Sequence, residues 1–370
     1  MTSGRKLMLF FSAPADYREE WIDHMAVALP DTEIVSVYDI AASRLRKFTL
    51  FPEQKGIRKY VLNACSRPLD AVRHVRRERP DLIIFHGYAL PSFLIAILYC
   101  ILAGIRYAFF SDANALQEHR ADKSPVKKRL LAFFVRHAYR LFFSSTMNRR
   151  YWEKVGGTLE QFVPLWFPVN SEKIQKQLTD RTVLSSLRGR YLDPTDRLII
   201  YCGRFAADKG GVDTLLRAMA ALPERYKLIL VGDGPQRAEL EALSASVGIN
   251  DRVWFLGSLP NEQAILHIAA SDLLVLPSNQ EAFGLVLNEA IAAGLPVIAS
   301  DIVGAAYDLI DEGKNGFIFP RGDHAKLAEA ILKSENLKRD DIETKRKEVI
   351  ERFSFEQNAQ SLETVLNGLR

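Results

Sequence analysis

Two glutamates that flank a glycine turn are the residues whose types and spacing best define a chemistry in this chain. Glu281 and Glu289 are eight residues apart, on either side of Gly284. The turn follows an apolar run, Leu273–Leu276, and opens an apolar helix, so its backbone N–H groups are free to bind phosphate. Carboxylates beside such a site would repel phosphate, so we expect them to accept hydrogen bonds from hydroxyl groups. The pattern predicts a site for a sugar nucleotide.

A second loop carries two cations. Arg204 and Lys209 are five residues apart between Gly203 and Gly210, after an expected strand. A guanidinium fork and an ammonium group can both reach one diphosphate and neutralise charge that grows on a leaving phosphate. Taken alone, this segment is better interpreted as a solvated loop. Its place at the same sheet edge as the glutamate turn favours diphosphate binding.

Short β-rich runs alternate with helical patterns along both halves, which predicts an α/β fold of parallel sheets with crossover helices. In the first half we expect strands at Leu7–Phe11, Ile34–Tyr38, Leu82–His86, Tyr107–Phe110 and Leu141–Ser144. In the second half we expect them at Leu198–Cys202, Lys227–Val231, Val253–Leu256, Leu273–Leu276 and Pro296–Ala299, with an edge piece at Gly316–Phe319. Ligands of doubly wound sheets bind beyond the carboxyl ends of the strands, where both loops fall.

Length and local composition predict two domains, because 370 residues exceed one ordinary core. The segment 164–196 has no long periodic pattern, so we place the interdomain link there. The predicted domains are residues 1–175 and 176–353, with a last helix at 354–370. The apolar segment 89–105 contains Pro91 and is shorter than a membrane span, so we expect a buried crossover helix that ends at Gly104.

Charge is unevenly spread. Residues 1–185 carry 28 Lys and Arg against 18 Asp and Glu, a net +10, whereas residues 186–370 carry a net −6. A basic half suggests contact with something anionic, such as a lipid surface or an acidic acceptor. The basic run Lys123–Arg150 is either a solvated helix face or a surface that docks to the anionic cytoplasmic leaflet.

The three cysteines and the N-terminus predict a cytoplasmic protein, peripheral on the membrane if that surface docks. Without metal-ligand spacing, the cysteines are expected to be small buried hydrophobes in a reducing compartment: Cys65, Cys100 and Cys202. The chain runs from Met1 into an apolar strand with no signal-peptide pattern. A nucleic-acid ligand is not expected, because no basic stripe is interleaved with aromatic residues.

The second half resembles glycosyltransferase family 4, whose members are retaining transferases of the GT-B fold. The matching motifs occur in the family's order: Gly-Arg to Lys-Gly at 203–210, Val-Gly-Asp-Gly-Pro at 231–235, Phe-Leu-Gly at 255–257, the two glutamates at 281–289 and Ala-Gly-Leu-Pro-Val-Ile-Ala-Ser at 293–300. The resemblance covers about 197–320, and the first half matches only in rhythm. It implies two Rossmann-like domains that face each other across a cleft, with the C-terminal helix crossing back to the first domain.

By that resemblance, Glu281 would bind hydroxyls of the donor sugar and Glu289 the ribose. Arg204 and Lys209 would stabilise the leaving diphosphate. Further donor contacts are implied for Phe283, Gly284, Leu285 and Val286 at the diphosphate, for Gly203, and for Leu256 and Gly257 near the base. The acceptor hydroxyl would attack from the leaving-group side, and a diphosphate oxygen would take its proton. No Asp-x-Asp pair stands where a metal would bridge the phosphates, so we expect metal-independent transfer and no cofactor.

The first half departs from the family in two loops. Ser12 follows the first strand where the family commonly has a glycine pair, and Asp112 stands where it often has a histidine. Asp112 is therefore expected to contact the donor sugar, with a turn-capping role as the alternative. On the acceptor side we place Ser12 together with three residues after later strands: His86, Asn148 and Arg149.

The sequence thus predicts a retaining glycosyltransferase that moves a sugar, from UDP rather than GDP, to a hydroxyl acceptor such as a lipid-linked or cell-surface glycan intermediate. Two alternatives remain open at this point. One is a sugar-nucleotide 2-epimerase of the same architecture, which needs no acceptor. The other is a catalytically impaired protein that binds a nucleotide sugar, as the altered loops of the first half would allow.

Overall fold

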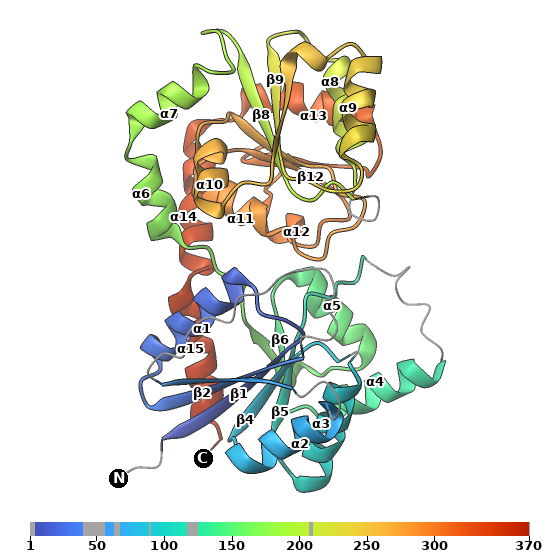
Figure 1. The fold of residues 1–370 in the computed structure, drawn as a ribbon, viewed down its shortest axis with the longest axis vertical. Helices are drawn as coiled ribbons and strands as arrows, with labels where there is room; N and C mark the ends of the chain where they lie inside the picture. The colour runs from blue at the N-terminus through green and yellow to red at the C-terminus, as the bar shows by residue number, and fades with distance from the viewer. Residues whose placement is uncertain are drawn as a thin grey trace. The chain divides into compact units, whose positions relative to one another are not determined.

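The structure is a computed structural model that describes residues 4–39, 56–62, 67–88, 90–116, 125–206 and 210–369. The chain forms two compact units (Figure 1). The first comprises Met1–Ser144, Asn148–Pro168 and Ser354–Arg370, and the second Ser145–Met147 and Val169–Phe353. The border after Pro168 precedes the predicted one after residue 175, which falls inside a helix of the second unit.

The first unit is built on a seven-stranded sheet in the order β3-β2-β1-β4-β5-β6-β7. Every neighbouring pair is parallel, as the alternation of strands and helices predicts. The strands are β1 (Arg5–Phe11), β2 (Thr32–Tyr38), β3 (Ile57–Val61), β4 (Leu82–His86), β5 (Tyr107–Phe110), β6 (Arg140–Phe143) and β7 (Phe162–Pro164). The helices are α1 (Asp16–Ala28), α2 (Arg67–Glu78), α3 (Pro91–Ala103), α4 (Pro125–His137), α5 (Thr146–Val155) and α15 (Phe355–Asn367), with a 3-10 turn, η3 (Leu159–Gln161).

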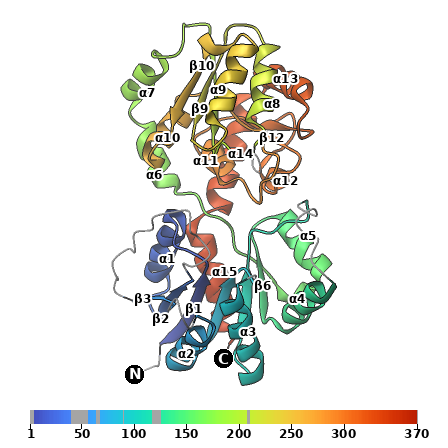
Figure 2. The ribbon, with the colours of Figure 1, turned by 45° about the vertical axis from the view of Figure 1, so that its right-hand side comes forward.

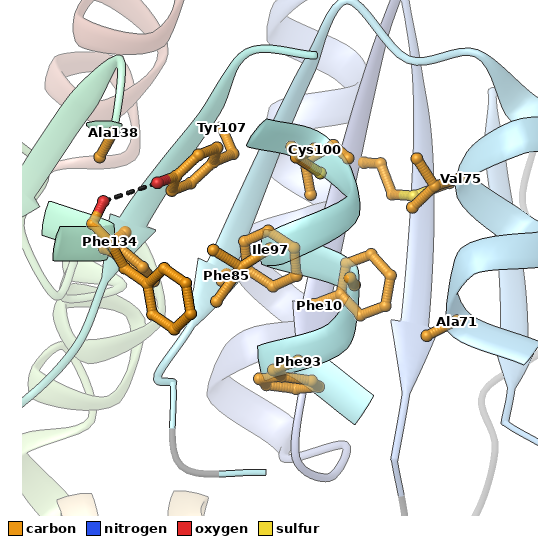
Figure 3. Close-up of a cluster of buried hydrophobic side chains, with 14 of the residues drawn as sticks. Phe10, Ala71, Val75, Phe85, Phe93, Ile97, Cys100, Tyr107, Phe134 and Ala138 are labelled. Carbon is orange, nitrogen blue, oxygen red and sulfur yellow. Dashed lines mark hydrogen bonds between the residues drawn. The ribbon is translucent and has the colours of Figure 1, made fainter. Parts of the chain in front are cut away.

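Successive strand residues point to opposite faces of this sheet, and each face has its own core. Phe10 and Phe85 stack on each other on the face that α2, α3, α4 and α5 cover, in a cluster rich in aromatic rings (Figure 3). Leu9 and Ile84 lie on the other face, which α1 and α15 cover. The C-terminal helix therefore packs in the first unit, as the resemblance implies.

Helix α3 differs from its prediction as a buried crossover helix. It ends at Gly104 as expected, and its inner side chains are buried. However, three large apolar side chains on its outer face are 42%, 45% and 78% exposed: Ile95, Leu98 and Leu102. The prediction was wrong about burial because a helix on the outside of a sheet contacts it with one face only, whatever its composition.

The second unit contains a six-stranded parallel sheet in the order β10-β9-β8-β11-β12-β13. Its strands are β8 (Arg197–Cys202), β9 (Tyr226–Val231), β10 (Val253–Gly257), β11 (Leu273–Leu276), β12 (Val297–Ser300) and β13 (Gly316–Phe319). One group of contacting helices is α8 (Val212–Ala220), α9 (Arg237–Ser246) and α13 (His324–Lys333). The other group is α6 (Ser171–Leu178), α7 (Arg181–Arg188), α10 (Asn261–Ala269), α11 (Leu285–Ala292) and α14 (Arg339–Arg352), and the two groups flank the sheet (Figure 2). The remaining elements are α12 (Ala306–Leu309), η4 (Asn250–Arg252) and η5 (Ser334–Asn336).

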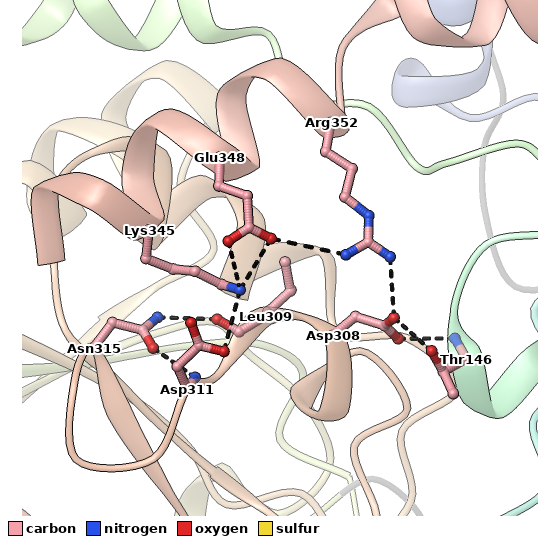
Figure 4. Close-up of polar contacts among 8 residues, drawn as sticks. All are labelled: Thr146, Asp308, Leu309, Asp311, Asn315, Lys345, Glu348 and Arg352. Atoms are coloured by element: carbon pink, nitrogen blue, oxygen red, sulfur yellow. Dashed lines mark hydrogen bonds and ion pairs between the residues drawn. The ribbon is translucent and has the colours of Figure 1, made fainter. Parts of the chain in front are cut away.

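Polar contacts fasten α14 to the loops of the second unit (Figure 4). The buried ammonium group of Lys345 contacts carboxylates of Asp311 and Glu348 at 3.4 and 3.0 Å. Arg352 pairs with Asp308 at 3.2 Å, and the same carboxylate accepts hydrogen bonds from the backbone N–H and hydroxyl of Thr146. Through these contacts, the short segment Ser145–Met147 belongs to the second unit.

Among the elements that the sequence did not predict are β3, β7, α6 and α7. The edge strand β3 reads Ile-Arg-Lys-Tyr-Val, too charged to be recognised as a strand from its composition. The strand β7 has three residues. The helices α6 and α7 have eight residues each, about two turns, which is too short to show a clear period of 3.6.

Candidate functional site

Three loops in the second unit hydrogen-bond to one another at the carboxyl ends of β8, β9 and β10. The backbone N–H of Gly203 donates to the carbonyl of Val231 at 2.9 Å, and that of Gly232 donates to Gly257 at 2.8 Å. Phe205 donates in the same way to Asp233 at 3.0 Å. The Gly203–Arg204 loop and the Leu256–Gly257 loop thus belong to one edge of the sheet, as the sequence predicts.

The first loop also meets the loop after β11. A Cβ atom on Gly211 would lie 1.8 Å from the carbonyl oxygen of Pro277, so only glycine permits this approach. Gly211 also has a φ of +87° and caps the start of α8. The close contact brings the chain that leaves Gly210 against the strand end that leads to Glu281.

The predicted phosphate turn is formed by Gly284 and the start of α11. Gly284 has a φ of +100° and is the N-cap, and a Cβ there would lie 2.9 Å from a methyl carbon of Val303. The carbonyl of Phe283 accepts a hydrogen bond from Ala305 at 3.0 Å, which fixes the turn from the other side. The N–H groups of Leu285 and Val286 fall in the first turn of α11, where no intrahelical acceptor serves them.

Both glutamates lie near the end of β8. Burial raises the pKa of the Tyr201 hydroxyl, and the negative charge of Glu281 raises it further. Burial also raises the pKa of the Cys202 thiol well above its ordinary value, and Glu289 adds to that shift. Tyr201 in turn donates a hydrogen bond to the carbonyl of Arg204 at 3.2 Å. One tyrosine therefore links the environment of Glu281 to the Arg204 loop.

Sequence reasoning missed two polar residues at this edge. Asn261, the first residue of α10, donates through Nδ2 to Oε1 of Glu289 at 3.2 Å. Arg321 is exposed and donates to the carbonyl of Asn279 at 3.2 Å, in the loop that precedes Glu281. Neither residue belongs to a recognisable motif, and only the strand order brings them here.

The second unit thus brings most of the predicted donor-side residues to one sheet edge. Arg204 is exposed, whereas Glu281 and Glu289 are half-buried. Lys209 lies outside the described residues. The described part of the chain holds no group of three or more His, Cys, Asp or Glu side chains placed to share a metal ion.

In the first unit the predicted residues have different surroundings. Asp112 is exposed in the loop after β5. Asn148 is 1% exposed, and its amide holds the backbone: Oδ1 accepts from Ser144 at 3.1 Å, and Nδ2 donates to Ala113 in the Asp112 loop. Asn148 is therefore part of the framework that positions that loop.

The other three acceptor-side candidates lie at strand ends or on α5. Arg149 forms an ion pair with Glu153 at 3.1 Å and covers the ring of Phe162. Ser12 is half-buried directly after β1. His86 ends β4, and its Nε2 is buried with no hydrogen-bond partner in the described part of the chain. Burial, and secondarily the charge of Arg18, lower the pKa of His86 well below its ordinary value.

The fold is that of the GT-B glycosyltransferases. The HepE protein of Anabaena, solved in complex with UDP, has a TM-score of 0.78 at 19% identity over 98% of this chain and 100% of that one. Sucrose-phosphate synthase of Thermosynechococcus elongatus has a TM-score of 0.77 at 20% identity over 99% of each chain. At such identities the likeness concerns the fold alone.

Two family descriptions match successive parts of the sequence. Residues 188–352 match "Glycosyl transferases group 1", and residues 16–166 match "Glycosyl transferase 4-like domain". The chain therefore belongs to the family 4-like glycosyltransferases, as the motifs of its second half predict.

The curated relatives match part of this chain. It is 35% identical over 188 residues to N-acetyl-alpha-D-glucosaminyl L-malate synthase of Bacillus anthracis, covering 49% of this chain and 48% of that protein. It is 34% identical over 150 residues to alpha-D-kanosaminyltransferase of Streptomyces kanamyceticus, covering 40% and 38%. The chain thus spans about half or less of the length of these relatives.

Proposed function

We propose that this protein is a retaining glycosyltransferase that moves a sugar from a nucleotide diphosphate to a hydroxyl acceptor. One observation carries the proposal: the Gly284 turn opens α11 between Glu281 and Glu289, at the edge where the Arg204 loop is fixed. A helix N-terminus suits the diphosphate, and the carboxylates suit the sugar and ribose hydroxyls. The names of both curated relatives agree with glycosyl transfer or synthesis.

In the proposed reaction, the bond from the anomeric carbon to the diphosphate oxygen breaks and a bond from the acceptor oxygen to that carbon forms. The acceptor proton passes to a diphosphate oxygen. Arg204, Lys209 and the N–H groups of α11 would stabilise the charge on the leaving group, and Glu281 would hold the sugar. We further propose that transfer is metal-independent, which predicts unchanged activity after treatment with a chelator.

UDP is the proposed nucleotide, with GDP as the alternative. Support comes from the fold neighbour HepE, which was solved with UDP. A thermal-shift screen with UDP, GDP, ADP and dTDP tests this choice, because a bound nucleotide raises the melting temperature. We expect the largest rise with UDP. A larger rise with GDP would reverse the choice of base.

Activity distinguishes this proposal from its two rivals. A transferase consumes the donor sugar in step with an added acceptor, whereas an epimerase converts UDP-sugar without one. A catalytically impaired binding protein shows the thermal shift but neither turnover nor slow donor hydrolysis. The names of the two relatives reported above favour transfer over epimerisation. Transfer with an inverted anomeric configuration would refute the retaining mechanism.

We also propose that the acceptor is a lipid-linked glycan intermediate and that the first unit docks on an anionic bilayer. Among the described helices, none is both long and apolar enough to cross a membrane. Helix α3 has no charged residue, carries an exposed apolar face (Ile95, Leu98 and Leu102), and contacts the basic helix α2. On α4 the exposed apolar residues Val126, Leu130 and Phe133 are interspersed with Lys127, Lys128 and Arg129. Apolar side chains among basic ones suit an anionic interface.

Sedimentation with vesicles tests this docking. We expect the protein to sediment with vesicles of mixed anionic and neutral phospholipid and much less with neutral ones. Leu102→Ser together with Phe133→Ser should weaken sedimentation about tenfold or more. The control Leu332→Ser changes a residue of the second unit that is as exposed as Phe133, and it should leave sedimentation unchanged. Equal sedimentation with neutral vesicles would contradict the proposed docking.

A further inference from the structure

A hollow in the first unit lies on the face of the sheet that α1 covers. It opens to solvent, and the space outside the protein atoms there, open solvent included, is about 460 Å³. Its walls come from the strand ends of β1, β4 and β5, from α1, and from the segment after β7. Most of the lining is aromatic or aliphatic, including Phe11, Trp21, Phe110, Trp166 and Phe167. Because this lining is mostly apolar, the hollow suits an apolar group.

Two polar side chains interrupt this apolar lining. Arg18 on α1 donates through Nη1 to the carbonyl of Ala13 at 2.7 Å, but its Nε is buried without a hydrogen-bond partner. His86 contributes a second buried nitrogen, Nε2, that also has none. Both residues line the hollow. A buried donor without a partner is costly, so Arg18 Nε favours a ligand that offers an oxygen atom, whereas His86 Nε2 donates or accepts according to its tautomer.

The positive charge of Arg18 indicates that the ligand is an anion. No carboxylate in the described part of the chain pairs with its guanidinium, which instead lies 5.6 Å from the ring centre of Phe11 and 5.3 Å from that of Tyr17. The nearby Glu19 does not serve it, because Glu19 accepts from Tyr38 and pairs with Lys59. A cation held among aromatic rings without an anion lacks its strongest partner.

We propose that this hollow binds a small amphipathic anion, namely a ring-sized apolar body that carries one carboxylate or phosphate group. The apolar body would occupy the aromatic walls, and the anionic group would accept a hydrogen bond from Arg18 Nε. A polyhydroxylated sugar fits poorly, because its hydroxyl groups would face apolar walls with two polar partners. If the proposed function holds, such an anion is a candidate acceptor or an acceptor's aglycone, and that step alone rests on the proposed function.

Direct binding tests the inference without requiring turnover. Trp21 and Trp166 line the hollow, so tryptophan fluorescence or calorimetry can follow titration with 2-naphthoate, its neutral counterpart 2-naphthalenemethanol, and acetate. We expect 2-naphthoate to bind at least tenfold more tightly than 2-naphthalenemethanol, and acetate not to bind. Comparing phenyl phosphate with 2-naphthoate tests whether the site prefers phosphate or carboxylate, and inorganic phosphate tests whether the anionic group binds without an aryl body. Failure of both aryl anions to bind would overturn the proposal.

Substitutions of residues that line the hollow test whether the aryl anions bind there. Arg18→Gln should weaken 2-naphthoate binding about tenfold or more and leave 2-naphthalenemethanol unchanged. Ile84→Trp, or Phe110→Trp if the first variant does not fold, fills the hollow and should abolish binding of both. Arg217→Gln removes an exposed arginine on α8, in the second unit, and serves as the control. Undiminished 2-naphthoate binding by Arg18→Gln would refute the assigned role of Arg18.

Measurements on the same samples distinguish failure of this proposal from failure of the proposed function. The thermal shift with nucleotide reports the site in the second unit, whereas the aryl anions report the hollow. A nucleotide shift without aryl-anion binding would refute the hollow as a site and leave the transferase proposal standing. Binding of 2-naphthoate without any nucleotide-induced thermal shift would support the hollow as a site and contradict the transferase proposal.

Discussion

Asn261 and Glu289, which are 28 residues apart in the sequence, are joined by a hydrogen bond of 3.2 Å from Nδ2 to Oε1. Asn261 begins α10, directly after the short loop that follows Leu256 and Gly257 at the end of β10. Glu289 lies on α11, one turn beyond the Gly284 cap. The bond orients the Glu289 carboxylate at the start of α11, where the proposed function places the ribose hydroxyls.

Changing Glu281 or Glu289 to glutamine is expected to affect different kinetic properties. Glu281→Gln should lower the transfer rate about 100-fold or more, because the residue is proposed to hold the sugar whose bond breaks. Glu289→Gln should mainly weaken donor binding, by about tenfold, because ribose is remote from the reacting carbon. Steady-state kinetics with varied donor separates the two effects. Glu224→Gln, at an exposed turn, is the control, and wild-type transfer by Glu281→Gln would contradict the assignment.

Gly284→Ala should destabilise the second unit and abolish the nucleotide-induced thermal shift. The residue has a φ of +100°, and the added methyl group would lie 2.9 Å from a carbon of Val303 and 3.0 Å from one of Leu276. Gly313→Ala is the matched control, since Gly313 has a φ of +75° but nothing within 4 Å of the added carbon. We expect a loss of about 1 kcal/mol in the free energy of unfolding for Gly313→Ala and about 2–4 kcal/mol for Gly284→Ala. If the two variants lost equal unfolding free energy in chemical denaturation, backbone strain at positive φ, and not crowding by Val303 and Leu276, would explain why position 284 requires glycine.

The donor-side edge was predictable because its determinants are local. A glycine turn, a helix start and the two flanking glutamates occupy one continuous stretch, and parallel strands carry such stretches to the same edge. The partners of these residues were not predictable. Tyr201 and Asn261 reach Glu281 and Glu289 through the order β10-β9-β8-β11, which the sequence pattern leaves undetermined.

In the first unit, the residues that line the hollow come from segments distant from one another in the sequence. All its strands except β3 and β7 could be recognised from β-branched and aromatic runs, yet the hollow could not be. Arg18 and His86 are 68 residues apart, and a single arginine on a helix gives no sign that it faces inward. Asn148 illustrates the same difficulty, because its position after a strand suggested ligand contact whereas its amide holds backbone groups.

Arg252 is expected to be the most sensitive arginine for stability in the second unit. It is 6% exposed, and its guanidinium donates to four backbone carbonyls, those of Met219, Leu222, Pro223 and Tyr226. Arg252→Met would leave these carbonyls without their donor, so we expect a loss of about 3 kcal/mol or more in the free energy of unfolding. The exposed Arg217 gives the control variant Arg217→Met. Losses of similar size in chemical denaturation would contradict this reasoning.

His86 should make the folded state of the first unit sensitive to acid. Burial, followed by the charge of Arg18, lowers the pKa of His86 well below its ordinary value of about 6.5. The unfolded chain therefore takes up a proton as the pH falls through about 6.5, while the folded protein does not, and stability decreases with falling pH. Burial lowers the pKa of His74 as well, so the effect of His86 must be measured as a difference.

His86→Phe isolates that difference, because the ring remains among Phe11 and Phe110 but cannot be protonated. Chemical denaturation at several pH values between about 5 and 8 should show a smaller loss of unfolding free energy on acidification for this variant than for the wild type. The exposed His137 gives the control His137→Gln, which should keep the wild-type pH dependence. Parallel curves for His86→Phe and the wild type would mean that His86 takes up its proton in the folded protein too. The hollow would then hold two cations side by side, and its preference for an anion would be stronger at low pH.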